Sequence, residues 1–257
     1  MANKKRPSVA SQRLQSDIMH ATEAKALRRR RATIQIAVTG GTLIVGVAAI
    51  AAVVLTQRAM NDVVPPSSPP AASVLSLADM PLTIGPDFVR VGATDASVTL
   101  SLYEDFSCPH CQEYETAVGP TLDELVATGE VAVVYHPIRV VTNYGNRAGS
   151  AATCVAEGDP DMWPTAHAGL FALHDATTDG WSNDQLRDYL VSQGVTTPSV
   201  LECVEEGRYE NWIDANTDAA LAAGVTATPT LMINGERSEM LDASELRRVV
   251  EGLLAEQ

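Results

Sequence analysis

The sequence predicts an α/β fold with a helical domain inserted between the two halves of its sheet, preceded by one transmembrane helix. Residues 32–57 carry no charged side chain over a length that would cross a bilayer. Segments rich in apolar and β-branched residues, typical of buried strands, occur at 97–106, 130–138 and 228–235. Between the second and third of these segments, at about 143–223, the patterns are helical.

The amino-terminal end has the charge pattern of a membrane anchor. Residues 1–31 contain nine Lys or Arg against two acids, Asp17 and Glu23. Thr33 to Leu55 is almost wholly apolar and, at about 1.5 Å per residue, covers roughly 34 Å, enough for the hydrocarbon core. A cleaved signal peptide is the alternative, but its apolar region is ordinarily only about 7–15 residues long. By the positive-inside rule we expect a single-pass protein of the cell membrane, with a cytoplasmic basic arm, a lipid-contacting helix at 32–57 and an extracytoplasmic remainder.

The charge balance differs on the two sides of this segment. Nine of the 18 basic residues lie before residue 32 and 30 of the 32 acidic residues lie after it, so the exported part has nine basic against 30 acidic residues, a formal charge of −21. A nucleic-acid-binding surface needs a basic patch, so we expect no nucleic-acid partner. Residues 58–75 are rich in Pro and Ser and predict a semi-rigid linker, and residues 76–257 suffice for one domain.

The boundaries of the expected elements come from turn and capping residues. The helix after the first strand, over about 111–129, contains Pro120, which predicts a kink or break. Asn234-Gly235 predicts a hairpin turn at the end of the third strand. The last, amphipathic helix is expected to begin at Asp242 or Ser244.

All four cysteines lie in the exported part, where disulfides persist. A structural zinc site usually needs two closely spaced ligand pairs, whereas Cys154 and Cys203 are 49 positions apart, so we expect no metal. His110, between Cys108 and Cys111, would also project away from a metal that these two shared. Joining Cys154 to Cys203 would close about 50 residues and contribute roughly 4 kcal/mol in the chain-entropy model. We expect a structural disulfide there, with a second redox pair or free thiols as the alternatives.

Cys108 and Cys111, separated by Pro109 and His110, have the features of a redox centre. A disulfide across so short a loop removes little entropy from the unfolded chain and is a weak staple. At the start of a helix, Cys108 would meet unsatisfied backbone N–H groups and the positive end of the helix dipole, which stabilise its thiolate. A protonated His110 would act in the same direction. A stabilised thiolate favours the reduced form by roughly 30 mV per 1.4 kcal/mol, so we expect the pair to pass its disulfide to other thiols.

Two segments together carry a resemblance to a known family. "YEDFSCPHCQEYE" followed about 120 residues later by "VTATPTLMING" resembles the DsbA-like thiol oxidoreductases of the thioredoxin superfamily, over about residues 88–257. The resemblance implies a thioredoxin fold with an inserted helical domain, which oxidises thiols of exported proteins without a bound cofactor.

The resemblance also implies roles for individual residues. Cys108 would be the exposed attacking cysteine and Cys111 the buried resolving one. Pro229 would be a cis-proline that faces Cys108, and the backbone of Thr228 before it would pair with an extended substrate strand. An ordinary trans turn proline is the alternative for Pro229.

One position departs from the family pattern. Thioredoxin-like proteins often keep a buried acid six residues before the first cysteine, as a proton acceptor for the resolving thiol, and here Leu102 stands at that position. Glu104 and Asp105 are the nearest acids. Either one accepts this proton through water, or both merely solvate the end of the strand.

The function that these observations predict is a thiol:disulfide oxidoreductase that introduces disulfides into reduced secreted or membrane proteins. Each cycle would leave its cysteines reduced, so a quinone-linked membrane oxidase similar to DsbB or to VKOR homologues is expected as a partner. The alternatives are a disulfide reductase or isomerase kept reduced by a membrane electron donor, and a non-catalytic thiol- or metal-binding module.

Overall fold

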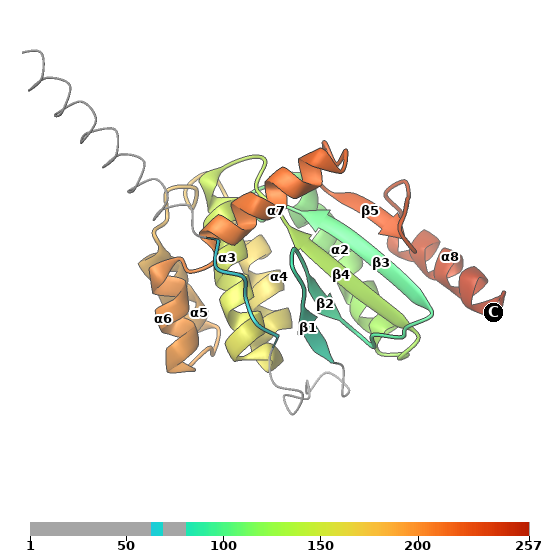
Figure 1. Cartoon of the computed structure of the whole chain (residues 1–257), viewed down its shortest axis with the longest axis horizontal. Helices are drawn as coiled ribbons and strands as arrows, with labels where there is room; N and C mark the ends of the chain where they lie inside the picture. Colours follow the sequence, from blue (N-terminus) through green and yellow to red (C-terminus); the bar gives the residue numbers. More distant parts are fainter. Residues whose placement is uncertain (1–62, 69–80, 257) are drawn as a thin grey trace, which may run out of the picture. The chain divides into compact units, whose positions relative to one another are not determined.

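A mixed sheet in the order β1-β2-β4-β3-β5-β6 lies at the centre of the described chain (Figure 1). The structure is a computed structural model that describes residues 63–68 and 81–256. The strands are β1 (Leu82–Ile84), β2 (Val89–Val91), β3 (Val98–Glu104), β4 (Val131–Pro137), β5 (Thr230–Ile233) and β6 (Glu236–Arg237). The helices are α2 (Pro109–Val126), α3 (Asn143–Gly158), the 3-10 helix η1 (Pro160–Met162), α4 (Trp163–Leu173), α5 (Asn183–Ser192), α6 (Pro198–Glu206), α7 (Glu210–Ala222) and α8 (Ala243–Ala255).

The register of the central strands brings distant parts of the chain to one edge of the sheet. β3 and β4 pair in parallel and are joined by α2, which packs behind the sheet in Figure 1. β5 runs antiparallel to β3 and places Thr230 opposite Tyr103. The start of β5 therefore lies beside the end of β3, where the chain enters α2. In open α/β sheets this carboxyl-terminal edge is where functional sites usually form.

The three expected strands correspond to β3, β4 and β5, whereas β1 and β2 are strands that the sequence analysis did not name. Both are three residues long, too short for a periodic pattern. A hairpin at Asn234 and Gly235, with positive φ values of 49° and 83°, connects β5 to β6 as expected. Of the two predicted caps of the last helix, Asp242 takes that position, in a capping box with Glu245.

Of the kink or break predicted at Pro120, the break was wrong, because α2 runs without interruption from Pro109 to Val126. Pro120 lies on the exposed side of the helix. Val118 and Leu122 on either side of it are each 2% exposed and belong to the main core. Packing of these side chains holds the helix together where the proline removes one backbone hydrogen bond.

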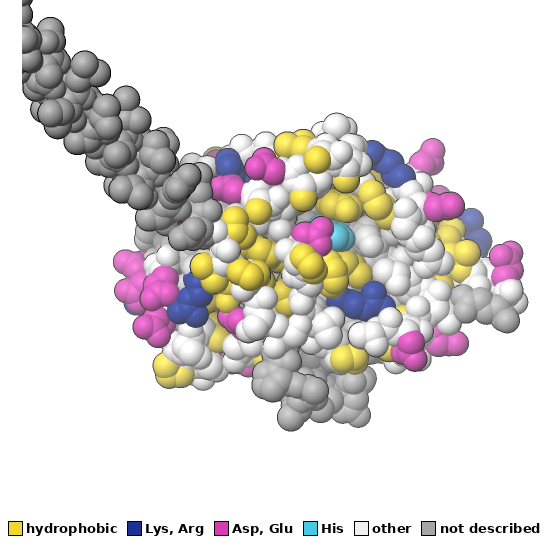
Figure 2. All heavy atoms as spheres, viewed as in Figure 1, with side chains coloured by type: hydrophobic (Ala, Val, Ile, Leu, Met, Phe, Trp, Pro, Cys, Tyr) yellow, Lys and Arg dark blue, Asp and Glu magenta, His cyan; other side chains and the backbone are white. Residues whose placement is uncertain are grey.

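The helices α3 to α7 occupy the interval between β4 and β5, and α3 to α6 lie together at one side of the sheet (Figure 1). A disulfide joins Cys154 of α3 to Cys203 of α6, with 5.8 Å between their Cα atoms. Side chains of this block, among them Phe171 of α4, continue the core of the sheet without a boundary. In Figure 2, charged side chains gather mainly toward the periphery of the visible face, including the part over α5 and α6.

Residues 63–68, in the predicted linker, pack against the globular unit. Pro66 is buried, and the backbone N–H of Ser67 donates to Glu157 Oε1 at 2.9 Å. The Ser68 hydroxyl donates to the Ile84 carbonyl and accepts from the Ile84 N–H, both at 2.9 Å. This part of the predicted linker is therefore held against α3 and β1.

The predicted basic arm at 1–31 and the predicted transmembrane helix at 32–57 lie outside the described residues. Within the ranges that the structure describes, no helix combines the length and the apolar character needed to cross a membrane.

Candidate active site

Cys108 is the residue at which the chain turns from β3 into α2. It is the N-cap of α2, with extended backbone angles (φ −89°, ψ 119°), and Pro109 occupies the first turn. Proline suits this place because the first N–H of a helix has no partner inside the helix. The backbone N–H of Cys108 donates to the Asp105 carbonyl at 2.9 Å and closes the turn. The sulfur therefore lies at the amino-terminal end of an 18-residue helix.

Asp105 organises the backbone around this turn. Its carboxylate is fully buried and accepts four hydrogen bonds of 2.6 to 2.8 Å, from the backbone and hydroxyl of Ser107 and from the backbone N–H groups of Val140 and Val141. Gly145 of α3 packs against it, since a Cβ added there would come within 2.0 Å of Asp105 Oδ1. A carboxylate that accepts four hydrogen bonds and has no contact with solvent has a structural role. Of the two predicted proton acceptors, Asp105 is therefore poorly placed to accept a proton from Cys111.

The two thiols of the motif are free and have opposite electrostatic environments. The Cys111 thiol donates a hydrogen bond to the Cys108 sulfur, and this bond is the main cause that lowers the pKa of Cys108 to about 5. A side-chain hydrogen bond from Thr228 and the backbone N–H groups of Cys111 and His110 act the same way, against the effect of burial. The same thiol–thiolate bond, followed by burial, raises the pKa of Cys111 far above its ordinary value. At neutral pH the pair thus holds a thiolate at Cys108 and a thiol at Cys111.

Cys108 is less accessible than the resemblance implied. It is 5% exposed, close to the 3% of Cys111, so "exposed" was wrong for this residue. The covering chain is the loop before β5, where the Thr228–Pro229 peptide bond is cis and the Thr228 carbonyl lies 3.5 Å from Cys108 Sγ. The structure therefore brings Thr228 and Pro229 to the redox pair, in the positions that the resemblance implied.

The imidazole of His110 does not lie against the Cys108 sulfur. It projects from the surface of α2, where Nδ1 is 3.3 Å from Glu113 Oε2, and both side chains are more than 70% exposed. The backbone of His110, and not its ring, is among the groups that lower the pKa of Cys108. The expectation that a protonated ring would add to the thiolate stabilisation is therefore not supported by the geometry.

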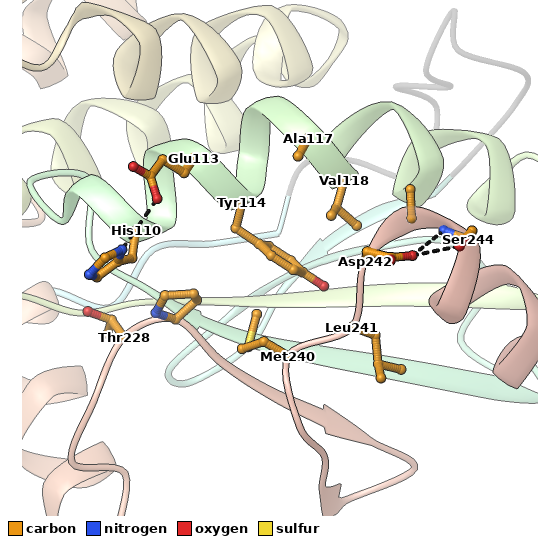
Figure 3. A pocket seen from close by; sticks show the side chains of 12 residues that line it. His110, Glu113, Tyr114, Ala117, Val118, Thr228, Met240, Leu241, Asp242 and Ser244 are labelled. Carbon is orange, nitrogen blue, oxygen red and sulfur yellow. Dashed lines mark hydrogen bonds and ion pairs between the residues drawn. The ribbon is translucent and has the colours of Figure 1, made fainter.

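A groove of about 810 Å³ begins beside the redox pair and runs between α2 and the segment that leads into α8 (Figure 3). His110 and Glu113 lie at one end, and the Tyr114 ring points from α2 toward Met240 and Leu241 on the other wall. Its lining is mainly apolar. A groove of this size and character suits side chains of an extended polypeptide.

Glu104, the second predicted proton acceptor, lies in a buried charged cluster. It is 2% exposed, and His167 Nε2 of α4 donates to its Oε1 at 2.6 Å. The other ring nitrogen of His167 is 3.4 Å from Glu115 Oε1 of α2. Burial alone would lower the pKa of His167, but Glu104 and then Glu115 raise it to about 10, so the imidazole is charged.

Comparison with known proteins agrees with this geometry. The sequence model of the family described as thioredoxin matches residues 85–252. The chain belongs to the thioredoxin family. Within the part of this thioredoxin-family chain that the structure describes, no group of three or more His, Cys, Asp or Glu side chains is arranged to hold a metal ion.

Solved structures of similar sequence are thiol–disulfide oxidoreductases. The reduced disulfide bond oxidoreductase DsbG of Mycobacterium tuberculosis is 31% identical, with a TM-score of 0.58 over 66% of this chain and 89% of that one. The oxidised DsbA of the same organism is 29% identical, with a TM-score of 0.58 over 65% and 93%. The serine/threonine-protein kinase PknE of M. tuberculosis is 27% identical over 131 residues, 47% of this chain and 23% of the kinase. The chain thus spans less than a quarter of the length of this last relative.

His167 and Glu115 are site residues of this thioredoxin-family chain that the sequence analysis missed. Glu115 had a detectable signal, because it follows Cys111 by one helical turn and so lies on the same face of α2. His167 had none: it lies 63 positions from Glu104, and only the folded arrangement of α4 against β3 brings the two together.

Proposed function

We propose that this chain is a thiol:disulfide oxidoreductase that introduces disulfide bonds into exported proteins through Cys108 and Cys111. The observation that carries the proposal is the position of Cys108 at the start of α2, where Cys111 and backbone N–H groups donate hydrogen bonds to its sulfur. These bonds lower the pKa of Cys108 to about 5, whereas the pKa of Cys111 is raised. Since the Cys108 thiolate stabilises the reduced pair, the oxidised pair tends to accept electrons.

The reaction begins with the disulfide between Cys108 and Cys111. A substrate thiolate attacks Cys108 Sγ, the bond between the two cysteines breaks, and Cys111 leaves with the electron pair and takes up a proton. A second substrate thiolate then attacks the substrate sulfur of this mixed disulfide and releases the Cys108 thiolate. Two substrate thiols lose two electrons and two protons; one proton goes to Cys111 and the other to solvent.

The substrate is a reduced, extended segment of a secreted or membrane protein. The groove lined by Tyr114, Met240 and Leu241 offers apolar contacts next to the sulfur, and the exposed Val140 and Val141 add apolar surface near the turn that Asp105 organises. Contacts of this kind do not depend on one sequence, which suits an enzyme that acts on many unfolded chains.

The location and the partner belong to the same proposal. Residues 32–57 hold the catalytic domain at the outer face of the cell membrane, and a quinone-linked oxidase of the DsbB or VKOR type reoxidises it. The uncharged segment after a basic arm supports the membrane location. The need for an oxidase follows from the reaction, since each turnover leaves Cys108 and Cys111 reduced.

Alkylation and a redox titration of the exported domain test the direction of electron flow. We expect Cys108 to react with iodoacetamide at pH 5 to 6, where an ordinary cysteine is almost wholly protonated. The lowered pKa of Cys108 predicts that the reduced protein gains thermal stability relative to the oxidised one as the pH rises from about 5 to about 9, because the thiolate forms first in the folded state. Above about pH 9 the raised pKa of Cys111 acts in the opposite direction, since that thiol ionises only in the unfolded chain. A potential near that of thioredoxin, about −270 mV, together with an unperturbed Cys108, would favour the reductase.

A further inference from the structure

We propose that His167 is a positioning residue for thiol–disulfide exchange. It is held between Glu104 and Glu115, and its positive charge offsets theirs. The buried cluster of these three side chains therefore does not destabilise the negative charge that develops on Cys111 during the reaction. The inference rests on the proposed function, because it concerns the sulfur that leaves in that reaction. It differs from a proton-acceptor role of Glu104, in which the carboxyl itself would speed the exchange.

The cluster draws its members from the sheet, the active-site helix and the inserted helices. Glu104 ends β3, Glu115 lies on α2 one turn after Cys111, and His167 reaches them from α4. The side chains of Glu104 and His167 are 2% and 3% exposed. Phe106, Phe171 and Trp163 pack around the imidazole, with ring centroids 4.6 to 5.4 Å away, so solvent screens these charges little.

The groups that face His167 are otherwise acidic or neutral. Glu104 approaches from β3, Glu115 and Asp123 from α2, and Tyr135 from β4. No lysine occurs after Lys25, and in the described residues no arginine is among the groups that shift the pKa of Glu104 or Asp123. His167 is therefore the cation that balances this part of the described core.

Cys111 is sensitive to the charge of the cluster. The negative charge of Glu104 is one of the causes that raise the pKa of Cys111, together with burial and the bond to Cys108. When a substrate thiolate attacks Cys108, negative charge builds up on Cys111 in the transition state. Burial raises the pKa of Glu104 and His167 acts to lower it, so without His167 the Glu104 carboxylate keeps its charge only at higher pH. Where the carboxylate is charged, a cluster with one more negative charge destabilises that transition state, whereas the neutral thiol and the neutral disulfide are little affected. His167 therefore acts on the rate of exchange and leaves the equilibrium potential nearly unchanged.

The test measures reduction of the oxidised exported domain by dithiothreitol from pH 7 to pH 9, with acid quenching, in three variants. At the pH values at which Glu104 is ionised, His167→Gln should react about three- to tenfold more slowly than the wild type. The uncompensated charge raises the pKa of the leaving Cys111 thiol by about one unit, and the exchange rate reflects part of that rise. Glu104→Gln should react faster by a similar factor, and the double variant should fall close to the wild type. The pKa of Cys108, measured from the pH dependence of alkylation, should stay within about 0.3 unit of the wild-type value. The equilibrium potential should stay within about 10 mV.

His174→Gln is the matched control, since His174 follows the same helix but pairs with Asp179 outside the cluster. It should leave the rate unchanged. Equal rates in wild type and His167→Gln would overturn the inference, and so would a Glu104→Gln variant that is slowed, since that result assigns the proton-acceptor role to Glu104. If His167→Gln does not fold, Glu104→Gln is compared with the double variant, which must be slower. A wild-type domain that fails to oxidise peptide thiols overturns the proposed function instead.

Discussion

The two cysteine pairs lie in the same buried core but differ in their spacing along the chain, in their place on the helices and in their access to a groove. Cys154 and Cys203, 49 positions apart, are joined between two helices that pack closely, and each is at most 2% exposed. Cys108 and Cys111 lie at a helix end beside an open groove and are free. Burial alone does not separate the pairs, because all four cysteines are buried.

What separates the pairs is the number of groups that stabilise a charge on sulfur. Cys108 receives hydrogen bonds from Cys111, from Thr228 and from backbone N–H groups at the start of α2. Cys154 lies within α3, where the backbone N–H groups are already used by the helix. A thiolate is therefore stabilised at Cys108 and not at Cys154. To be stable, a thiolate needs donors aimed at it as well as a partner cysteine.

The largest expected effect is the loss of Cys108. Cys108→Ser should reduce oxidation of a reduced peptide to the uncatalysed rate, because the hydroxyl neither forms a disulfide nor ionises at neutral pH. The peptide assay is followed by mass spectrometry of the products. Cys111→Ser is the companion variant, which should accumulate a mixed disulfide at Cys108. Comparable activity in Cys108→Ser and the wild type would remove this pair from the reaction.

Removal of the second pair should affect stability and leave activity in place. The double variant Cys154→Ala, Cys203→Ala should lose about 2–4 kcal/mol in the free energy of unfolding, because the unfolded chain is no longer cross-linked. Urea denaturation of both proteins, with Cys108 and Cys111 oxidised, measures the difference. A variant that folds normally but no longer turns over would show that both pairs carry electrons.

The sequence was most informative where a function is carried by residues close together in the chain. The helix start at Cys108, the capping residue Asp242 and the turn at Asn234 follow from local rules, and each is present in the structure. The class of the fold followed from the order of strands and helices. Local patterns fail where a contact is made only by folding: nothing near Glu104 in the chain indicates that His167 will lie 2.6 Å away.

Accessibility and direction of side chains were also outside the reach of sequence patterns. The spacing of the motif places His110 beside Cys108 along the chain, but the helix turns its ring toward Glu113. The family resemblance placed Pro229 opposite Cys108, but it did not indicate that the sulfur would be buried beside this loop from 120 positions further along. Such outcomes depend on rotamers and on long-range packing, which no periodic pattern encodes.

Gly145 lies on the helix that connects the two cysteine pairs, because α3 supports the active-site turn at one end and carries Cys154 toward the other. Gly145→Ala should lower the free energy of unfolding by about 2 kcal/mol, since the added Cβ displaces Asp105 and leaves buried backbone donors without a partner. Gly252→Ala in α8 is the control, with nothing within 4 Å of an added Cβ, and should be neutral or slightly stabilising. Thermal unfolding of the two variants and the wild type measures these changes in stability. Equal stability would mean that Asp105 moves aside without loss.

The smallest expected effect is that of His110, and it tests which donors the Cys108 thiolate uses. The ring lies on the solvent side of α2 against Glu113, and the backbone of His110 contributes to the lowered pKa. His110→Ala should therefore shift the pKa of Cys108 by less than about 0.5 unit, as expected of an exposed and screened charge. Absorbance of the thiolate at 240 nm, recorded against pH, gives this value, with Glu113→Gln as the control for the surface pair. A rise of a full unit or more in His110→Ala alone would place the ring against the sulfur in solution, and would assign to the side chain the stabilisation that we attribute to Cys111, Thr228 and the helix start.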